Sequence, residues 1–186
     1  MLLIRHAQSE WNLRFSRTRI DAGPPDPVLT PAGREQARAA AALLAGLPPI
    51  RTIVASPYRR CLETAVLIAD RIGVPVRVDA LVRERCAFSC DRGSPPGLLG
   101  RLWPELAFDH LDESWWGRAI ESQPSIRRRA AEFRDLARTW PDQERALVVT
   151  HWGFLRALTG LEVENGTLVR YDPTSGVACE EAVVPA

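Results

Sequence analysis

The sequence contains no lysine: all 24 basic residues are arginine, and 23 acidic residues bring the formal net charge to +1. The absence of lysine excludes Schiff-base catalysis and the lysine-dependent phosphate site of P-loop proteins. A net charge this close to zero gives no reason to expect nucleic acid or an anionic membrane surface as a partner.

Long apolar runs are missing as well. No segment approaches the roughly 20 apolar residues that span a bilayer, and Leu2-Leu3-Ile4 is too short for the core of a signal peptide. We therefore expect a cytoplasmic protein without membrane contact. In that compartment the four cysteines should be free thiols; they are Cys61, Cys86, Cys90 and Cys179.

A metal site finds little support. Cys86 and Cys90 are separated by three residues and His110 follows later, whereas zinc ligands usually come in tighter pairs with a second matched pair. We expect neither a metal nor another cofactor.

Short segments rich in β-branched and aliphatic residues alternate with helical ones. The strand candidates are Leu2–Ile4, Thr52–Ala55, Val74–Val78 and Ala146–Thr150, followed by a possible hairpin of Thr167–Tyr171 and Val177–Val184. Thr30-Pro31 and Ser56-Pro57 begin two helices that end at Gly46 and Gly73. Two more are expected over 125–139 and after His151. This alternation predicts an α/β fold, a three-layer α/β/α sandwich around a mostly parallel sheet of about six strands.

A length of 186 residues suggests a single domain over residues 1–186. Residues 81–123 differ from the rest because they are rich in glycine and proline and show little periodicity. We expect an insertion there that covers one end of the sheet and caps the active site. This insertion, which carries Trp103, Trp115 and Trp116, is expected to shape specificity.

Two histidines follow predicted strands: His6 comes after Ile4, and His151 comes directly after Thr150. Ligands of open α/β sheets bind outside the carboxyl ends of the strands, so the two side chains can converge. Arg5 precedes His6, and Arg60 lies in the first turn of a helix, where free backbone N–H groups favour anions. Arginine forks match tetrahedral oxyanions, and the set describes a pocket for a phosphoryl group.

Four segments carry these residues: Arg5-His6-Ala7-Gln8-Ser9-Glu10-Trp11-Asn12, Leu29-Thr30-Pro31-Ala32-Gly33-Arg34-Glu35-Gln36-Ala37, Ser56-Pro57-Tyr58-Arg59-Arg60-Cys61-Leu62-Glu63-Thr64-Ala65, and Val148-Val149-Thr150-His151-Trp152-Gly153. In order, they resemble the four signatures of the histidine phosphatases, or phosphoglycerate mutase-like superfamily. Those signatures are Arg-His-Gly with a later Asn, Leu-Thr-x-x-Gly-x-x-Gln-Ala, Ser-Pro-x-x-Arg-Ala-x-Gln-Thr-Ala, and a final His-Gly-Gly.

The resemblance implies a phosphoglycerate mutase-like fold and a phosphatase that acts on a small phosphate monoester without metal. It makes His6 the nucleophile that becomes phosphorylated, with Arg5, Asn12, Arg60 and His151 on the phosphoryl oxygens. Glu84 matches the family's proton donor, which follows the third strand, and Glu10 is its rival. A neutral imidazole can attack phosphorus while cationic donors stabilise the transferring oxygens.

Three residues depart from the signatures. Ala7 and Trp152 replace glycines, and Glu63 replaces a glutamine and should face away from phosphate. Trp152 could form a substrate wall or pack in the core. Arg14, Arg17 and Arg19 are expected in a solvated loop, although they could recruit anions, and Arg127-Arg128-Arg129 on the wet side of a helix.

Two other functions remain open: phosphoglycerate mutase-type phosphoryl transfer and a non-catalytic phospho-ligand binding module. The mutases of the family are longer and use additional Arg, Tyr and Lys residues to hold a carboxylate, and this sequence has no lysine. The full set of predicted catalytic residues argues against a binding module. The sequence specifies neither the substrate nor the oligomeric state.

Overall fold

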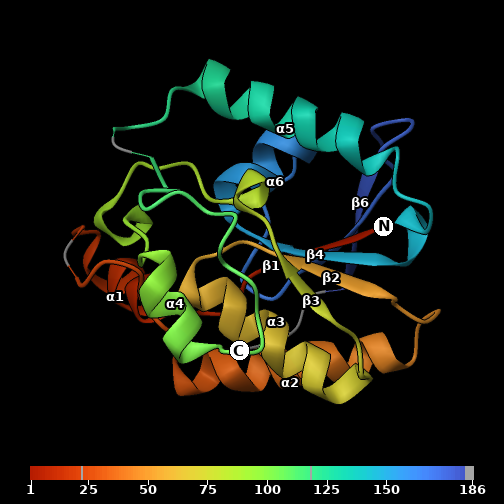
Figure 1. The fold of residues 1–186 in the computed structure, drawn as a ribbon, viewed down its shortest axis with the longest axis horizontal. Coiled ribbons are helices and arrows are strands. Elements are labelled where there is room, and N and C mark those ends of the chain that lie inside the picture. Colours follow the sequence, from red (N-terminus) through yellow and green to blue (C-terminus); the bar gives the residue numbers. More distant parts are fainter. Residues whose placement is uncertain (22, 118, 183–186) are drawn as a thin grey trace.

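A six-stranded sheet forms the centre of the protein in a computed structural model that describes residues 1–21, 23–117 and 119–182 (Figure 1). The strands are β1 (Leu2–Arg5), β2 (Thr52–Ala55), β3 (Val76–Val78), β4 (Ala146–Thr150), β5 (Leu168–Tyr171) and β6 (Ala178–Ala182), in the order β3-β2-β4-β1-β5-β6. The first four are parallel, whereas β5 runs antiparallel to β1 and β6 antiparallel to β5. The predicted mostly parallel sheet and its terminal hairpin are confirmed. Residues 183 and 184 of the predicted last strand lie outside the described residues.

Helices cover both faces of the sheet. The α-helices are α1 (Glu10–Thr18), α2 (Pro31–Ala45), α3 (Arg59–Ile72), α4 (Pro96–Leu102), α5 (Gln123–Ala137) and α6 (Trp152–Thr159). Helices α2 and α3 lie on one face and α5 and α6 on the other (Figure 1), which confirms the three layers. Three short 3₁₀ helices are Ala80–Val82, Ser89–Asp91 and Gln143–Arg145. No helix of the described ranges is long and apolar enough to cross a bilayer.

Alternation along the strands divides the core in two. Leu2 and Ile4 of β1 pack in the cluster that contains α2 and α3, while Leu3 packs in the cluster with α5 and α6. A sheet buried on both faces requires nearly continuous apolar strands, which is why β1 and β4 appear in the sequence as uninterrupted aliphatic runs.

The two predicted helix starts behave differently. Thr30 caps α2 as expected, its hydroxyl accepting from the backbone N–H of Gly33 at 2.9 Å. Ser56 does not cap α3: that helix begins at Arg59 and Tyr58 at its N-cap makes no side-chain hydrogen bond. The Ser56 hydroxyl is instead 2.8 Å from Nε2 of His151. The prediction for Ser56 was wrong because a tertiary partner takes its hydroxyl.

Two arginine segments also differ from expectation. Arg14 and Arg17 lie on helix α1 rather than in a loop, because Ser9 and Asn12 form a reciprocal capping box at its start. Arg129 is 6% exposed and therefore does not lie on the wet side of α5, in contrast to the exposed Arg127 and Arg128.

Candidate active site

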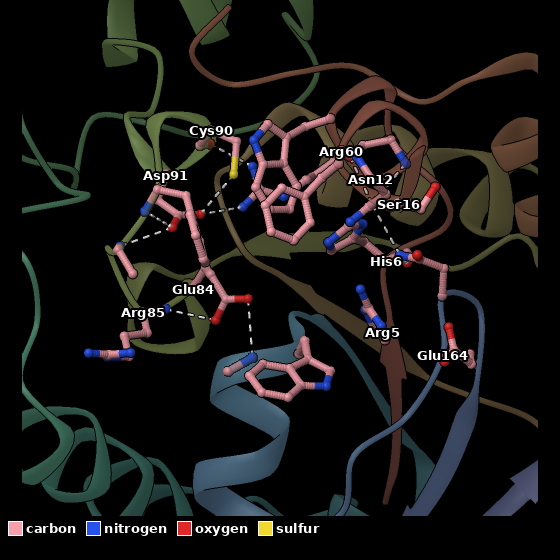
Figure 2. Close-up of a pocket in the computed structure, with 18 of the residues that line it drawn as sticks. Arg5, His6, Asn12, Ser16, Arg60, Glu84, Arg85, Cys90, Asp91 and Glu164 are labelled. Atoms are coloured by element: carbon pink, nitrogen blue, oxygen red, sulfur yellow. Dashed lines mark hydrogen bonds and ion pairs between the residues drawn. The ribbon is translucent and has the colours of Figure 1, made fainter. Parts of the chain in front are cut away.

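A cavity of about 580 Å³ lies where strand β1 ends and helices α1, α3 and α6 begin. Five predicted site residues line it: Arg5, His6, Asn12, Arg60 and Glu84. Figure 2 shows His6 and Glu84 projecting toward the same open space from different segments, with Arg5 and Arg60 nearby. The sixth predicted residue, His151, is fully buried and is not part of the lining.

His6 is held in one orientation by backbone contacts. Its Nδ1 is 2.8 Å from the carbonyl oxygen of Ala7, and its backbone N–H donates to Thr150 at 2.8 Å. Because a carbonyl can only accept, we assign the proton to Nδ1, which leaves Nε2 with a free lone pair. Burial, followed by the positive charges of Arg60 and Arg5, lowers the pKa of His6 well below 6.5. His6 is therefore a neutral imidazole near pH 7.

Arg60 enters the site from the first turn of α3 and is fixed on three sides. Its guanidinium donates to the carbonyl of Cys90 at 2.9 Å and to Asp91 Oδ1 at 3.1 Å, and it lies 4.3 Å from the centre of the Tyr58 ring. Arg60 and Asp91 are both buried. Asp91 belongs to no signature, so the sequence offered no signal for this partner.

Arg5 and Asn12 keep donors available. One Arg5 Nη donates to the carbonyl of Val163 at 2.7 Å, while its buried Nε has no partner among the described residues. Asn12 Oδ1 accepts from Ser9 N–H at 3.0 Å, from the Ser9 hydroxyl at 2.8 Å and from Asn165 at 3.3 Å. With the oxygen occupied in this way, the amide NH₂ of Asn12 is the group left for a ligand. Asn165, which belongs to none of the four signatures, also donates to His6 O at 2.9 Å.

Glu84 is seated on the N-terminus of α6. Its carboxylate accepts from the backbone N–H groups of Arg85 at 2.8 Å, Gly153 at 3.1 Å and Phe154 at 3.2 Å. Burial and the nearby Asp91 raise the pKa of Glu84 above 4.5, although the N–H groups of Arg85 and Gly153 act in the opposite direction. A side chain at Gly153 would overlap Glu84 Oε1, which explains the glycine of the fourth signature.

Arg129 and Glu121 fasten the segment that carries Glu84. Arg129 donates to the carbonyls of Leu81 at 2.9 Å, Arg83 at 2.7 Å and Glu84 at 3.3 Å. Its guanidinium also pairs with the Glu121 carboxylate at 2.5 Å, and both side chains are more than nine-tenths buried. Arg129 thus links helix α5 to the backbone around Glu84. The sequence did not indicate this role of Arg129, because three successive arginines suggested a solvated helix face.

His151 lies behind His6, with the two ring centroids 5.1 Å apart. Its Nε2 is 2.8 Å from the Ser56 hydroxyl and 3.3 Å from Cys61 Sγ. Burial and the charge of Arg60 lower the pKa of His151 well below 6.5, so it too is neutral.

The structure locates the three residues that depart from the signatures and the rival acid Glu10. Ala7 is fully buried and donates its backbone N–H to Thr64 Oγ1 at 3.2 Å. Glu63 forms an ion pair with Arg34 outside the cavity, as expected. Trp152 is half-buried and lines the cavity, which favours the wall over the core. Glu10, the rival acid, is exposed and outside the lining.

The tryptophans of segment 81–123 lie outside the cavity lining. Trp115 packs on Tyr58 with ring centroids 4.6 Å apart and donates to Ser94 O at 2.9 Å, while Trp103 and Trp116 pack against the same core cluster. These side chains therefore anchor their segment to the core, and the same segment contributes Phe88 to the cavity. The aromatic residues of the lining are Trp11, Phe15, Phe88 and Trp152.

The cysteine–histidine set considered for zinc does not come together. His110 Nε2 is 3.0 Å from the carbonyl of Val78, whereas Cys90 is buried in the cavity wall beside Asp91. Among the residues that the structure describes, no group of three or more His, Cys, Asp or Glu side chains is arranged to hold a metal ion. All four cysteines are free thiols, as expected.

Comparison with known proteins assigns the family. Residues 1–177 match the model of the histidine phosphatase superfamily, branch 1. A glucosyl-3-phosphoglycerate phosphatase of Mycolicibacterium vanbaalenii is 34% identical over 179 residues, covering 89% of this chain and 76% of the relative. A putative phosphoserine phosphatase 2 of Hydrogenobacter thermophilus is 30% identical over 176 residues, covering 89% and 81%.

The fold is shared with solved structures as well. The native structure of a mycobacterial glucosyl-3-phosphoglycerate phosphatase superposes with a TM-score of 0.62 at 21% identity, covering 100% of this chain and 98% of that one. The expected phosphoglycerate mutase-like fold is thus confirmed. On the strength of the family match across almost the whole chain, this protein belongs to the histidine phosphatase superfamily.

Proposed function

We propose that this protein is a phosphatase that hydrolyses a small phosphate monoester through a phosphohistidine on His6. The observation that carries the proposal is a neutral His6 with Nδ1 tied to Ala7 O and a free Nε2 in a cavity shared with two arginines. The printed names of the relatives, which include glucosyl-3-phosphoglycerate and phosphoserine phosphatases, support a small phosphorylated substrate.

In the first step Nε2 of His6 attacks phosphorus and the bond from phosphorus to the ester oxygen breaks. Glu84 gives its proton to the departing oxygen, which leaves as a neutral alcohol. The raised pKa of Glu84 supports this role, because a raised pKa favours the protonated carboxyl that an acid needs. Arg5, Arg60 and the amide of Asn12 donate to the phosphoryl oxygens and stabilise their charge.

In the second step the Glu84 carboxylate takes a proton from water, whose oxygen attacks phosphorus. The bond from Nε2 to phosphorus breaks, and inorganic phosphate and neutral His6 are released. His151 is the proposed fourth contact, made when its Nε2 exchanges the Ser56 hydroxyl for a phosphoryl oxygen. The 5.1 Å between the two histidine rings supports this exchange.

The proposal includes metal-independent chemistry of the histidine acid phosphatase type, in a single cytoplasmic domain. Arg5 and Arg60 supply the positive charge that a metal ion would otherwise contribute at the transferring oxygens. Segment 81–123 caps the active site in this proposal, which is supported by its cavity-lining residues Arg85, Phe88 and Asp91.

Release of phosphate from p-nitrophenyl phosphate between acidic and neutral pH tests the proposal. We expect turnover that persists in EDTA and is inhibited by vanadate, a mimic of five-coordinate phosphorus. Absence of turnover by folded protein on this ester and on a broad panel would favour the binding module. Loss of activity in EDTA with rescue by a divalent ion would contradict metal independence.

A further inference from the structure

We call the part of the cavity that contains Arg5, His6, Arg60 and Glu84 its phosphoryl end. The rest of the cavity has a wall of aromatic side chains. Trp11 and Phe15 of α1 are stacked, with centroids 4.5 Å apart and ring planes 11° apart. Phe88 from the segment before 3₁₀ helix Ser89–Asp91 lies against both, at 5.1 Å and 5.6 Å. Phe88 is 45% exposed, so apolar surface faces water inside the cavity that contains His6.

This wall is held in shape by one carboxylate. Asp21 accepts from the indole N–H of Trp11 at 3.0 Å, from the Ser89 hydroxyl at 2.7 Å and from Ser89 N–H at 3.0 Å. Asp21 therefore ties α1 to the segment that carries Phe88. The aromatic surface is preorganised before a ligand arrives, which reduces the ordering cost of binding.

A fourth aromatic side chain enters the same cavity from α6. Trp152 stands where the family signature has glycine, and the guanidinium of Arg156 lies 5.2 Å from its ring centre. Thus this chain places an indole in the cavity that contains His6, where the signature has no side chain at all.

The remaining charged lining carries a small positive excess. Asp91 is already paired with Arg60, which leaves Arg19 and Arg85 against Glu164. The volume of about 580 Å³ falls in the range of about 300–1,000 Å³ found for pockets that enclose whole small ligands, whose walls are mostly apolar with a few placed polar groups.

We propose that the organic group of the substrate is a ring with an apolar face, which packs against Trp11, Phe15, Phe88 and Trp152 while its phosphate is held beside His6. The inference rests on the proposed phosphatase function and specifies its substrate class. An aromatic ring and the face of a sugar ring share this chemistry, because both present C–H or π surface to an aromatic wall. A short acyclic charged group would leave the wall in water.

Three primary phosphate esters with similar leaving groups test the proposal: 2-phenylethyl phosphate, glucose 6-phosphate and phosphoserine. We expect kcat/KM for at least one ring ester to exceed that for phosphoserine by about tenfold or more, since burying a ring removes apolar surface from water. The better ring ester identifies the kind of ring. A value for phosphoserine that equals or exceeds both ring values would overturn the proposal.

Phe88→Ala locates the effect, and Leu102→Ala is its control, because Leu102 is 44% exposed and lies outside the cavity. Phe88→Ala should lower the ratio of kcat/KM for the better ring ester over phosphoserine about fivefold, mainly through KM, whereas Leu102→Ala should leave that ratio unchanged. An unchanged ratio in Phe88→Ala would contradict the proposal. Failure of all three esters and of p-nitrophenyl phosphate would instead refute the phosphatase itself, and turnover of phosphoserine without a ring preference would refute only the substrate class.

Discussion

The two ends of the cavity are built in different ways. At the phosphoryl end, each side chain that lines it is fixed by backbone or buried partners: His6 by Ala7 O, Arg60 by Cys90 O and Asp91, and Glu84 by three N–H groups. At the aromatic end, Trp11, Phe15 and Phe88 pack on one another, and Phe88 remains 45% exposed to the cavity although Asp21 ties its segment to Trp11. Catalysis needs fixed donors and a fixed nucleophile. Discrimination among organic groups needs an exposed apolar surface that the bound substrate can bury. The comparison thus predicts large effects on catalysis at the first end and smaller, substrate-dependent effects at the second.

Removing the nucleophile should have the largest effect. His6→Ala leaves the arginines in place but no atom to accept the phosphoryl group, and we expect kcat to fall about 10³-fold or more. Steady-state phosphate release measures it. Glu10→Gln is the control, because Glu10 shares the first signature but is exposed outside the cavity. Equal losses in both variants would contradict the assignment.

Glu84→Gln should have the second-largest effect on catalysis. The amide cannot protonate the departing oxygen, so single-turnover phosphoryl transfer from an alkyl phosphate should slow about a hundredfold or more. Nitrophenolate is a better leaving group, and its transfer step should slow less. Equal small losses with both esters, together with a large selective loss in Glu10→Gln, would move the acid role to Glu10.

Arg129→Gln should impair proton donation by Glu84, although Arg129 is not part of the cavity lining. The buried Glu121 loses its partner, and we expect the free energy of unfolding to drop by about 3–5 kcal/mol. Among molecules that stay folded, transfer from alkyl phosphates should slow roughly tenfold more than transfer from nitrophenyl phosphate, because a displaced Glu84 matters most for poor leaving groups. Denaturant unfolding and single-turnover kinetics measure the two effects.

The neighbour on the same helix is the control for that prediction. Arg128→Gln changes an exposed arginine and should alter stability by no more than about 0.5 kcal/mol. An equal slowing of both esters in Arg129→Gln would leave Arg129 with a purely structural role.

The pH profile should give the smallest but most diagnostic effect. Neutral His6 is required, and its lowered pKa means that the acid limb of kcat/KM lies below pH 6.5. Protonated Glu84 is required as well, and its raised pKa places the alkaline limb above 4.5. Activity on alkyl phosphates should therefore follow a bell-shaped profile that has both limbs. Glu84→Gln should lose the alkaline limb and keep the acid one; a retained alkaline limb would assign it to another group.

Features with a local pattern could be predicted from the sequence, whereas contacts between distant segments could not. Strand and helix positions followed from apolar runs and from Thr30-Pro31, and the strand ends brought Arg5 and His6 to one cavity with Arg60 and Glu84. Contacts between distant segments had no local signal: Asp91 on Arg60, Asn165 on His6, and Arg129 on the carbonyls around Glu84.

Composition alone was misleading where burial decides. The run Arg127-Arg128-Arg129 was expected on the wet side of a helix, but Arg129 is buried against the carbonyls around Glu84. Ser56 was expected as a helix cap, but its hydroxyl lies against His151. In each case tertiary packing overrode a valid local preference.

Rapid quenching with ³²P-labelled substrate shows whether His6 carries the phosphoryl group. We expect an acid-labile, base-stable phosphate on the wild-type protein, located on Nε2 of His6 because Nδ1 is tied to Ala7 O, and no label on His6→Ala. Equal labelling of wild type and His6→Ala would contradict this expectation.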